Sequence, residues 1–419
     1  MTVDLFWAFT PTPAPTTPDT PSSSSSSDTG GRQRGTLGCS QHVAYIQDKC
    51  QGPRLCELKD LTTVSYDRRL DDISEAVVEI PISGDSNQAC CACLADVEPW
   101  CHVLTIVREG DGVVWTGPIQ KVTYGYDKVT IEAKDKLAWL QVRVNEGEIS
   151  EFLLNCTTGN PCVPLTTIAK GICEVAMADD GDTPCFLDCI LDMGDGIPNN
   201  DAKQRDFPAF GGPTAFDDFQ TMADSGIDYT VVNQCLLLMP SKIPDGAIGT
   251  LTDEMILGDV SVIKDGNQLA NRWFVRYTSD DDCDGLCYPQ QDAVGAAHLC
   301  PCPAVEDTDQ LYCYGRVERV LQDLGLPNLT AARETASSYL AASKYAPRLV
   351  EFPSGTRLSP ETPWGLNEMI PGQRIDVALS KLCLPIFQSF KLQNVKVEDG
   401  PDGESISVDL KALDQVADS

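Results

Sequence analysis

The sequence is poor in the residues that most enzymes use for catalysis. It contains three histidines, His42, His102 and His298. None of them lies in an HExxH, Gly-x-Ser-x-Gly or Cys/His signature, and no phosphate-binding loop or dinucleotide motif stands between a strand and a helix. The sequence therefore predicts no enzymatic activity, no catalytic residue and no cofactor. A glycosidase-type carboxylate pair such as Glu148 and Asp192 stays open, because so acidic a chain offers many such pairs by chance.

Basic residues are scarce as well. The chain has 31 Lys and Arg against 62 Asp and Glu, a formal net charge of −31. Binding to a phosphate backbone needs clustered Lys and Arg, so the excess of acidic residues argues against direct DNA binding. It also predicts that DNA can pass the protein without adhering to it. A surface tuned only for solubility is the simpler alternative.

Long apolar runs are missing too. No stretch approaches the roughly 18 apolar residues of a transmembrane helix, and the start of the chain, MTVDLFWAFTPTP, has no basic region before its short apolar stretch. We therefore expect neither a membrane anchor nor a secretory signal peptide.

Cysteine, by contrast, is abundant. Nineteen cysteines are many for a protein of a reducing cytoplasm, and they predict that the chain later meets an oxidising environment in which disulfides form. One cluster contains Cys283, Cys287, Cys300 and Cys302, with His298 inside it. Zinc is one reading of this cluster, but structural zinc sites favour CxxC spacing. Local disulfides and buried free thiols stay open, so no metal site is predicted with definite ligands.

The first 38 residues are expected to form an arm. Residues 11–36 are rich in Pro, Ser, Thr and Gly and cannot bury enough apolar surface to fold, so they predict a flexible tether. The apolar segment LFWAF at 5–9 precedes this tether. It is read either as a docking peptide for a neighbouring protein or as a frayed terminus.

Residues 39–149 predict an antiparallel β module. HVAYIQD at 42–48 alternates, and EGDG at 109–112 predicts the turn of a hairpin. In the following hairpin, alternation turns Lys128, Thr130, Glu132 and Lys134 outward. KDKLAWLQVRV at 134–144 predicts a closing helical turn. The side chains expected to pack this half-barrel are Trp115, Ile119, Val129, Ile131 and Trp139.

The rest of the chain divides into three further regions. Residues 150–226 predict a helical insert with two amphipathic helices, the second starting at the N-cap Thr214. Residues 227–310 predict a second β module with a cysteine-rich loop. Residues 311–419 predict a helix pair at 315–325 and 330–346, and then strands that complete the second module. The expected fold class is thus β-rich α+β, with two half-barrel-like antiparallel modules and short helical inserts.

Three segments of the sequence resemble the minor tail proteins of long-tailed phages that infect actinobacteria. The segments are 55–83, 90–143 and 314–379, and the likeness extends over residues 39–412. Its most distinctive parts are the Cys-Cys to Glu-Pro-Trp run at 90–100, the Trp-x-Gly-Pro-Ile strand at 115–119 and LSPETPWGLNEMIPGQRIDV at 358–377. The family is that of the tail hub, also called baseplate hub.

The resemblance implies a structural protein of the virion. Three copies would form a hub that closes the tail tube at its distal end, joins the distal tail protein ring to the tip or central fibre, and opens for DNA. The implied partners are two further copies, the distal tail ring, the tape measure protein and other minor tail proteins, with assembly in the host cytoplasm. A cell-wall hydrolase or a receptor-binding tip protein is the alternative, although no fused lysin domain is recognisable. No functional residue carries over.

Overall fold

The chain has a β-rich fold with few and short helices, as the sequence predicts. Of the arm expected at 1–38, residues 1–36 lie outside the described residues, so the tether and its docking peptide stay predictions. The last two residues belong to the fold instead, since Leu37 is buried in the first hydrophobic cluster and Gly38 donates its amide to Glu404. The computed structural model describes residues 37–38, 40–48, 52–58, 61–82, 93–146, 165–177, 189–192, 213–224, 227–240, 246–264, 266–279, 298–301, 305–306, 314–321, nine residues between 332 and 346, 348–353, 355–383 and 385–413.

The largest element is a 13-stranded sheet, whose first part we call the N-terminal half-sheet. Its strand order is β3-β4-β7-β6-β5-β1-β2, and all neighbours are antiparallel. The hairpins expected at 109–112 and after Tyr124 are both present. The strands are β1 (His42–Asp48), β2 (Arg54–Leu58), β3 (Thr63–Arg69), β4 (Glu75–Pro81), β5 (His102–Arg108), β6 (Gly112–Tyr124) and β7 (Lys128–Lys134).

The remaining strands of this sheet form the C-terminal half-sheet, in the order β13-β18-β22-β21-β20-β11. All its neighbours are antiparallel except β20 and β11, which are parallel. The strand β21 is 15 residues long, so its first part pairs with β20 and its second part is left to pair elsewhere. The strands are β11 (Ala247–Thr252), β13 (Ser261–Lys264), β18 (Arg348–Glu351), β20 (Arg374–Leu379), β21 (Ile386–Gly400) and β22 (Gly403–Ala412).

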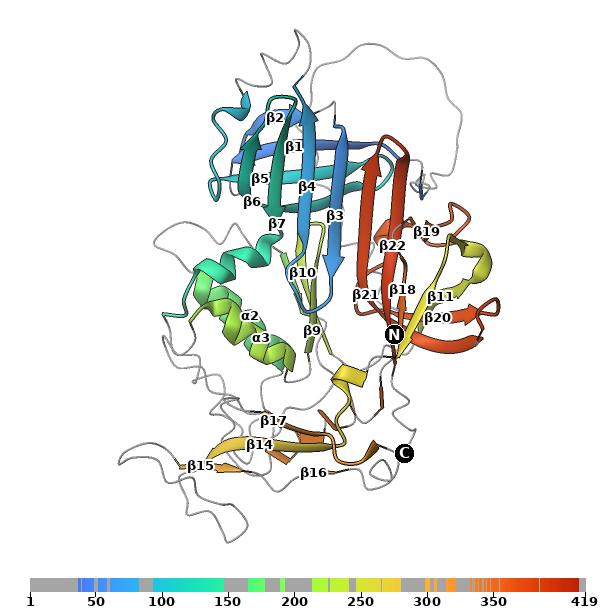
Figure 1. Ribbon diagram of the computed structural model, residues 1–419. Helices are drawn as coiled ribbons and strands as arrows, with labels where there is room; N and C mark the ends of the chain where they lie inside the picture. Colours follow the sequence, from blue (N-terminus) through green and yellow to red (C-terminus); the bar gives the residue numbers. More distant parts are fainter. Residues whose placement is uncertain are drawn as a thin grey trace, which may run out of the picture. The chain divides into compact units, whose positions relative to one another are not determined.

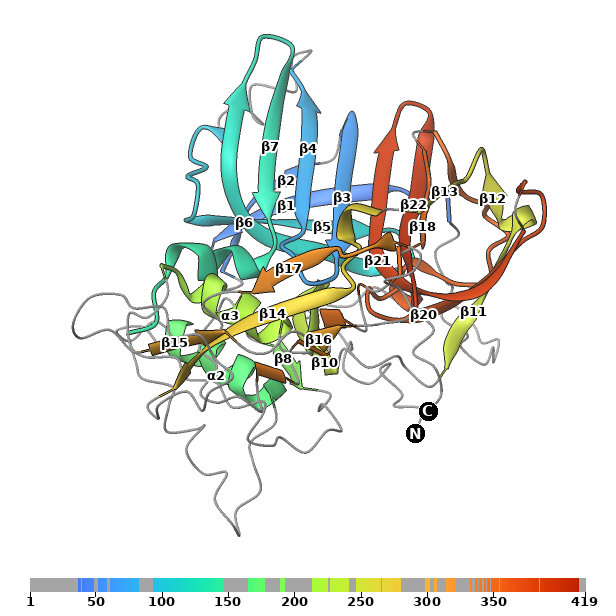
Figure 2. The same cartoon turned by 60° about the horizontal axis from the view of Figure 1, so that its bottom comes forward.

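The two half-sheets repeat one strand order. Taken in sequence across each sheet, β3, β4, β7, β6, β5 and β1 correspond to β13, β18, β22, β21, β20 and β11. The β6–β7 ladder shifts register between Ile119 and Lys121, and the corresponding β21–β22 ladder shifts between Leu392 and Asn394. Figure 2 shows both hairpins turning at the same end of the sheet. The structure thus contains one strand order twice, with the difference that β1 is antiparallel to β5 whereas β11 is parallel to β20.

A hydrophobic cluster draws side chains from both half-sheets. Trp115, Ile119, Val129 and Ile131 are buried in it, as predicted, and the pattern along β7 turns its Lys, Thr and Glu residues outward. Trp139 differs from the prediction, because η2 (Lys136–Val142) takes the chain away from the sheet and places this ring in a second cluster, edge-on to Trp100.

The second hydrophobic cluster joins η2 to two helices and a small sheet. The helix α2 (Leu165–Met177) contacts α3 (Ala215–Asp224), and both match the predicted helices. Thr214 is the N-cap, since the amide of Asp217 donates to its Oγ1. The sheet has the order β8-β10-β9, with β8 (Cys189–Asp192), β9 (Ile227–Val232) and β10 (Cys235–Pro240).

Several strands lie outside the arrangement expected of a second module at 227–310. The strands β9 and β10 belong to the small sheet, and β14 (Arg272–Ser279) pairs with β15 (His298–Pro301), β16 (Val305–Glu306) and β17 (Glu318–Leu321). The helix expected at 315–325 is wrong over β17, because parallel pairing with β14 overrides the local helical pattern. The residues described between 332 and 343 are helical, as predicted.

Five short elements complete the described fold. The strands β12 and β19 pair with each other, and the turns η5, η6 and η7 are 3-10 helices. Their bounds are β12 (Ile256–Leu257), β19 (Arg357–Leu358), η5 (Asp253–Met255), η6 (Gly266–Gln268) and η7 (Leu366–Glu368).

Candidate functional site

The two half-sheets meet at a backbone ladder between β3 and β21, which we call the joint (Figure 1). It runs antiparallel from Asn394 opposite Arg69 to Asp399 opposite Val64. Since β21 is the fourth strand of its half-sheet and β3 is the first of the other, the joint places two half-sheets of one strand order side by side in a single sheet.

A buried ion pair lies beside the joint. Arg108, at the end of β5, donates from Nε to Glu404 Oε1 over 2.6 Å and from Nη2 to Oε2 over 2.8 Å. Both side chains are fully buried, and Asp111 is a second partner of Arg108. Burial alone would lower the pKa of the guanidinium, but the hydrogen bonds and charge of Glu404, with the charge of Asp111, outweigh it and hold that pKa above its usual value.

His42 extends this ionic cluster across the sheet. Its Nδ1 lies 2.8 Å from Asp399 Oδ2, and its Nε2 lies 3.3 Å from the Tyr66 hydroxyl. The Glu404 carboxylate also accepts the amide of Gly38 over 2.7 Å. Burial raises the pKa of Tyr66, so its hydroxyl stays protonated. The cluster therefore ties β1, β3, β5 and the β21–β22 hairpin together by side chains as well as by backbone.

Arg68 makes a second set of contacts on the same side of β3. Its guanidinium donates to the carbonyls of Leu366 and Val114, both over 3.0 Å, and to Asn233 Oδ1 over 3.1 Å. Burial lowers the pKa of this group. Asn367 continues the chain of contacts by donating to Asp111. The distinctive segment 358–377 thus supplies two acceptors for Arg68, the Leu366 carbonyl and Asn367 Oδ1, the second over 3.5 Å.

The chemistry of this ionic cluster is structural. His42, Tyr66, Arg68, Arg108 and Glu404 are all buried and hydrogen-bonded to one another or to backbone carbonyls. A reaction site needs groups that a substrate can reach. Separating the buried Arg108–Glu404 pair would leave an uncompensated charge, so the pair disfavours other arrangements of the two half-sheets.

The residues singled out for catalysis or metal binding are placed as follows. Asp192 is exposed at the end of β8 and accepts from Thr167 Oγ1 over 3.2 Å, whereas Glu148 lies outside the described residues. The cluster Cys283, Cys287 and Cys302 also lies outside them, and of Cys300 only the backbone, in β15, is described. Within the described part of the chain, no group of three or more potential metal ligands comes together.

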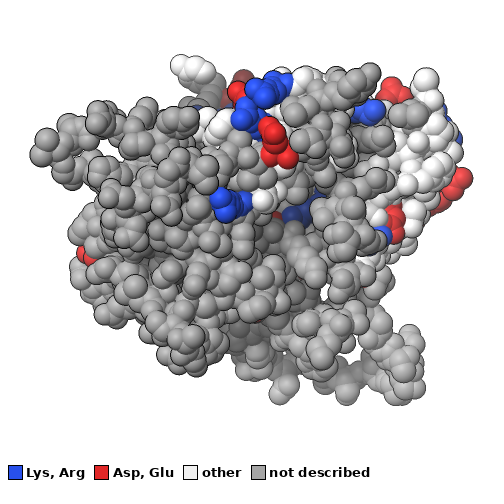
Figure 3. Space-filling view, turned by 90° about the horizontal axis from the view of Figure 1, so that it is seen from below, with Lys and Arg blue, Asp and Glu red and all other residues white. Residues whose placement is uncertain are grey.

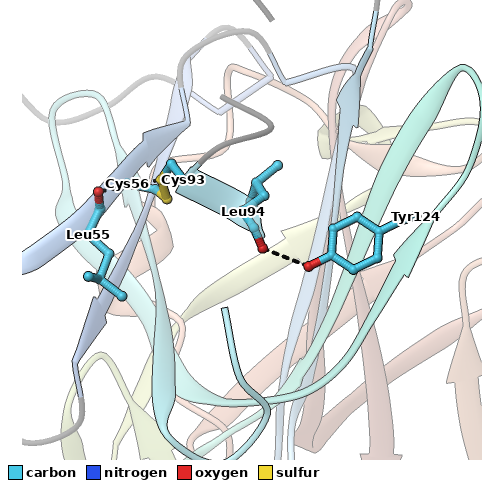
Figure 4. Close-up of a disulfide and its surroundings, with 5 residues drawn as sticks. All are labelled: Leu55, Cys56, Cys93, Leu94 and Tyr124. Carbon is cyan, nitrogen blue, oxygen red and sulfur yellow. Dashed lines mark hydrogen bonds between the residues drawn. A yellow bond between two sulfur atoms is a disulfide. The ribbon is translucent and has the colours of Figure 1, made fainter. Parts of the chain in front are cut away.

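Two disulfides are present among the described residues, Cys56–Cys93 and Cys189–Cys235. The first ties β2 to the turn that begins at Cys93 (Figure 4). The next residue in that turn, Leu94, accepts a hydrogen bond from the Tyr124 hydroxyl over 2.6 Å (Figure 4). The disulfide therefore fastens the segment before β5 to β2, and the hydrogen bond holds the same segment to Tyr124 of β6.

The ionic cluster was missed by motif reasoning, although the sequence contains a signal for it. Along β5, Arg108 lies on the same face as the core residues Leu104 and Ile106. Along β22, Glu404 lies on the same face as Ile406 and Val408. A charged residue on the core face of an amphipathic strand needs a buried partner of opposite charge. Strand alternation identifies Arg108 and Glu404 as charges on buried faces, but it does not show that the two side chains pair with each other.

In the described residues, no helix combines the length and apolar character needed to cross a bilayer. On the face seen in Figure 3, the described Lys and Arg side chains stand near Asp and Glu.

Comparisons with known proteins identify the fold. No family model matches the sequence, and no curated protein matches it. A tail protein from Neisseria meningitidis MC58 is similar in structure, with a TM-score of 0.57 and 12% identity over 90% of this chain and 97% of that one. The 43 kDa tail protein of prophage MuSo2 from Shewanella oneidensis gives 0.53 and 14% over 88% and 98%. The prophage tail protein gp18 from Listeria monocytogenes EGD-e gives 0.51 and 10% over 90% and 95%. The chain thus has the fold of prophage tail proteins.

Proposed function

We propose that this protein is a structural component of a phage tail, that three copies form a hub closing the tail tube at its distal end, and that the hub opens for the genome. The observation that supports the proposal is the joint, by which one chain holds two half-sheets of the same strand order side by side. Three such chains offer six similar modules, the number that matches a ring with sixfold symmetry.

The ionic cluster supports this role. An adapter between symmetric rings must keep its two modules at one fixed angle, and a buried ion pair between them disfavours other angles, because a buried charge that loses its partner is strongly destabilising. The Arg108–Glu404 pair joins the two half-sheets in this way. The net charge of −31 suits a protein that DNA must pass without adhering.

The partners proposed for the hub are the distal tail protein ring, the tape measure protein and the tip or central fibre proteins. The similarity to tail proteins from three other sources supports a location in the tail. The likeness of the sequence to minor tail proteins of actinobacteriophages favours a long-tailed phage of that host group, assembled in the host cytoplasm.

Imaging of intact particles tests the proposal. Gold-labelled antibodies raised against residues 39–145 should bind only at the distal end of the tail, and threefold averaging of the tip should improve the density. Label along the tail, on the head or on no particle would contradict the hub. Mass measurement of the purified full-length chain supplies an independent test, with a trimer as the expected result.

A further inference from the structure

A buried lysine–aspartate pair connects the large sheet to the second hydrophobic cluster. Lys391 Nζ of β21 contacts Asp228 Oδ2 of β9, and the two side chains are 15% and 5% exposed. In four other lysine–carboxylate pairs the lysine is 41–61% exposed; these pairs are Lys121–Glu132, Lys128–Glu79, Lys170–Glu174 and Lys396–Glu398. The Lys391–Asp228 pair is therefore shielded from water to an extent that these surface pairs are not.

Backbone contacts hold the two residues in place. The amide of Leu70 donates to the Gln393 carbonyl of β21 over 2.8 Å. The amide of Asp71 donates to the Tyr229 carbonyl of β9 over 2.9 Å, and the Tyr229 amide donates in return to Asp71 Oδ1 over 2.9 Å. The turn after β3 thus ties β21 to β9 beside the pair, so the fold itself positions the two side chains.

The surroundings of Asp228 favour its protonated form. Burial raises the pKa of this carboxyl, although the charges of Lys391 and Lys411 and the hydrogen bond from Lys391 oppose the shift. Lys411 is the direct neighbour of Lys391 in the β21–β22 ladder. Transfer of one proton from the ammonium to the carboxylate removes two charges from a low-dielectric site and leaves an amine beside a carboxylic acid.

We propose that Lys391 and Asp228 condense to an intramolecular amide bond that joins β21 to β9. After the proton transfer, the Nζ lone pair attacks Cγ of Asp228 and forms the C–N bond. The C–O bond to the hydroxyl then breaks, and the hydroxyl takes a second proton from the nitrogen and leaves as water. One ammonium and one carboxylate give one amide and one water, so the reaction consumes no oxidant and no cofactor.

Three features of the site promote this condensation. The reacting groups are already in contact, and well-oriented intramolecular reactions reach effective molarities of about 10⁵–10⁸ M. The positive charge of Lys411 stabilises the negative charge that develops on the Asp228 oxygen when the nitrogen adds. Burial of both side chains keeps out the water that would favour the reverse reaction.

The amide gives the chain a crosslink that is independent of redox conditions. Disulfides need an oxidising environment, whereas this bond can form in a reducing cytoplasm and persists outside it. It ties the second hydrophobic cluster, which contains Ile227 and Tyr229 of β9, to the C-terminal half-sheet. Because both residues lie within one chain, the crosslink does not depend on the proposed hub.

Intact-mass measurement of the purified full-length chain tests the bond. The chain is reduced, alkylated and denatured, so that disulfides and non-covalent contacts do not contribute. We expect a mass lower than that of the sequence by one water and, after proteolysis, a branched peptide that joins residue 391 to residue 228. A mass equal to that of the sequence, or a water lost at any other position, overturns the proposal.

A variant of the lysine separates the bond from the ion pair. Lys391→Arg keeps a positive charge and hydrogen-bond donors but lacks the amine, so it should show the full sequence mass and no branched peptide. Lys396→Arg is the matched control, since Lys396 lies on the same strand and pairs with the exposed Glu398, and it should lose one water as the wild type does. If the loss persists in Lys391→Arg or disappears in Lys396→Arg, it does not come from the Lys391–Asp228 bond.

Discussion

Arg108 and Glu404 lie 296 positions apart in the sequence and form a doubly hydrogen-bonded pair that is fully buried. The pair joins the end of β5 in one half-sheet to the start of β22 in the other. Burying two charges costs several kcal/mol of solvation, which the mutual hydrogen bonds must offset. Its value to the protein is therefore the fixed relation between the half-sheets, and loss of either partner should be severe.

Glu404→Ala should lower the free energy of unfolding by about 3–5 kcal/mol, the usual result of leaving one charge of a buried pair without its partner. The variant would also remove the acceptor of the Gly38 amide. Chemical denaturation of the purified chain measures the loss. Glu398→Ala is the matched control on the same hairpin, because the Glu398–Lys396 pair is exposed and should be worth less than about 1 kcal/mol. Equal effects of the two substitutions would contradict a structural role for the buried pair.

Gly117→Ala should lower the free energy of unfolding by about 3 kcal/mol or more. Gly117 lies in the Trp-x-Gly-Pro-Ile strand, and a Cβ there would stand 1.8 Å from the Lys134 carbonyl oxygen, so the backbone would have to move. The control is Gly246→Ala, since a Cβ at Gly246 meets nothing within 4 Å. Thermal unfolding of both variants measures the effect. If Gly117→Ala unfolds at the same temperature as the wild type, a clash with the Lys134 backbone is ruled out.

Strand alternation predicted much of the N-terminal half-sheet, because a sheet with one buried face has apolar residues at alternate positions of each strand. The core side chains Trp115, Ile119, Val129 and Ile131 were found in this way, as was the N-cap Thr214 by its position before an apolar helical stripe. Local patterns succeed where the neighbours of a segment are close in sequence.

Pairing between distant segments could not be predicted. The joint brings residues 64–69 against 394–399, and nothing local to either strand indicates the other. The segment at 318–321 has a helical pattern but is the strand β17, because β14 offers it a backbone partner. Likewise, the apolar runs of β9 and β10 are consistent with any buried sheet, and only contact with α2 and α3 assigns them to the second cluster.

Replacing both cysteines of the Cys189–Cys235 disulfide with serine should lower the free energy of unfolding. The bond closes a loop with a sequence separation of 46, for which chain entropy gives about 4 kcal/mol, and measured losses are typically about 2–4 kcal/mol. Denaturation without reductant measures the difference. Cys383→Ser, at an exposed free cysteine, is the control and should change stability by less than about 0.5 kcal/mol. A double variant as stable as the wild type would show that the disulfide does not support the fold.

Asp135 should make stability depend on pH between about 4 and 7. It caps η2 and is buried, and this burial raises its pKa to about 7 against the opposing hydrogen bonds from the Ser74 and Leu137 amides. Across this range the folded chain keeps a proton that the unfolded chain has lost. The contribution of Asp135 to stability is therefore greatest at the acidic end and falls as pH rises, by at most about 1.4 kcal/mol per pH unit, before levelling off above pH 7.

The difference in unfolding free energy between wild type and Asp135→Asn isolates this contribution, because Asn does not titrate. The wild type should become less stable relative to Asp135→Asn as pH rises from 4 to 7. Asp253→Asn is the control of opposite sign: hydrogen bonds from Ser380 and the Lys381 amide, outweighing slight burial, lower the pKa of Asp253, so its contribution is lost only under more acidic conditions. A flat difference for Asp135→Asn over this range would mean that the buried carboxyl is already ionised at pH 4 and that the two backbone donors, rather than burial, set its charge.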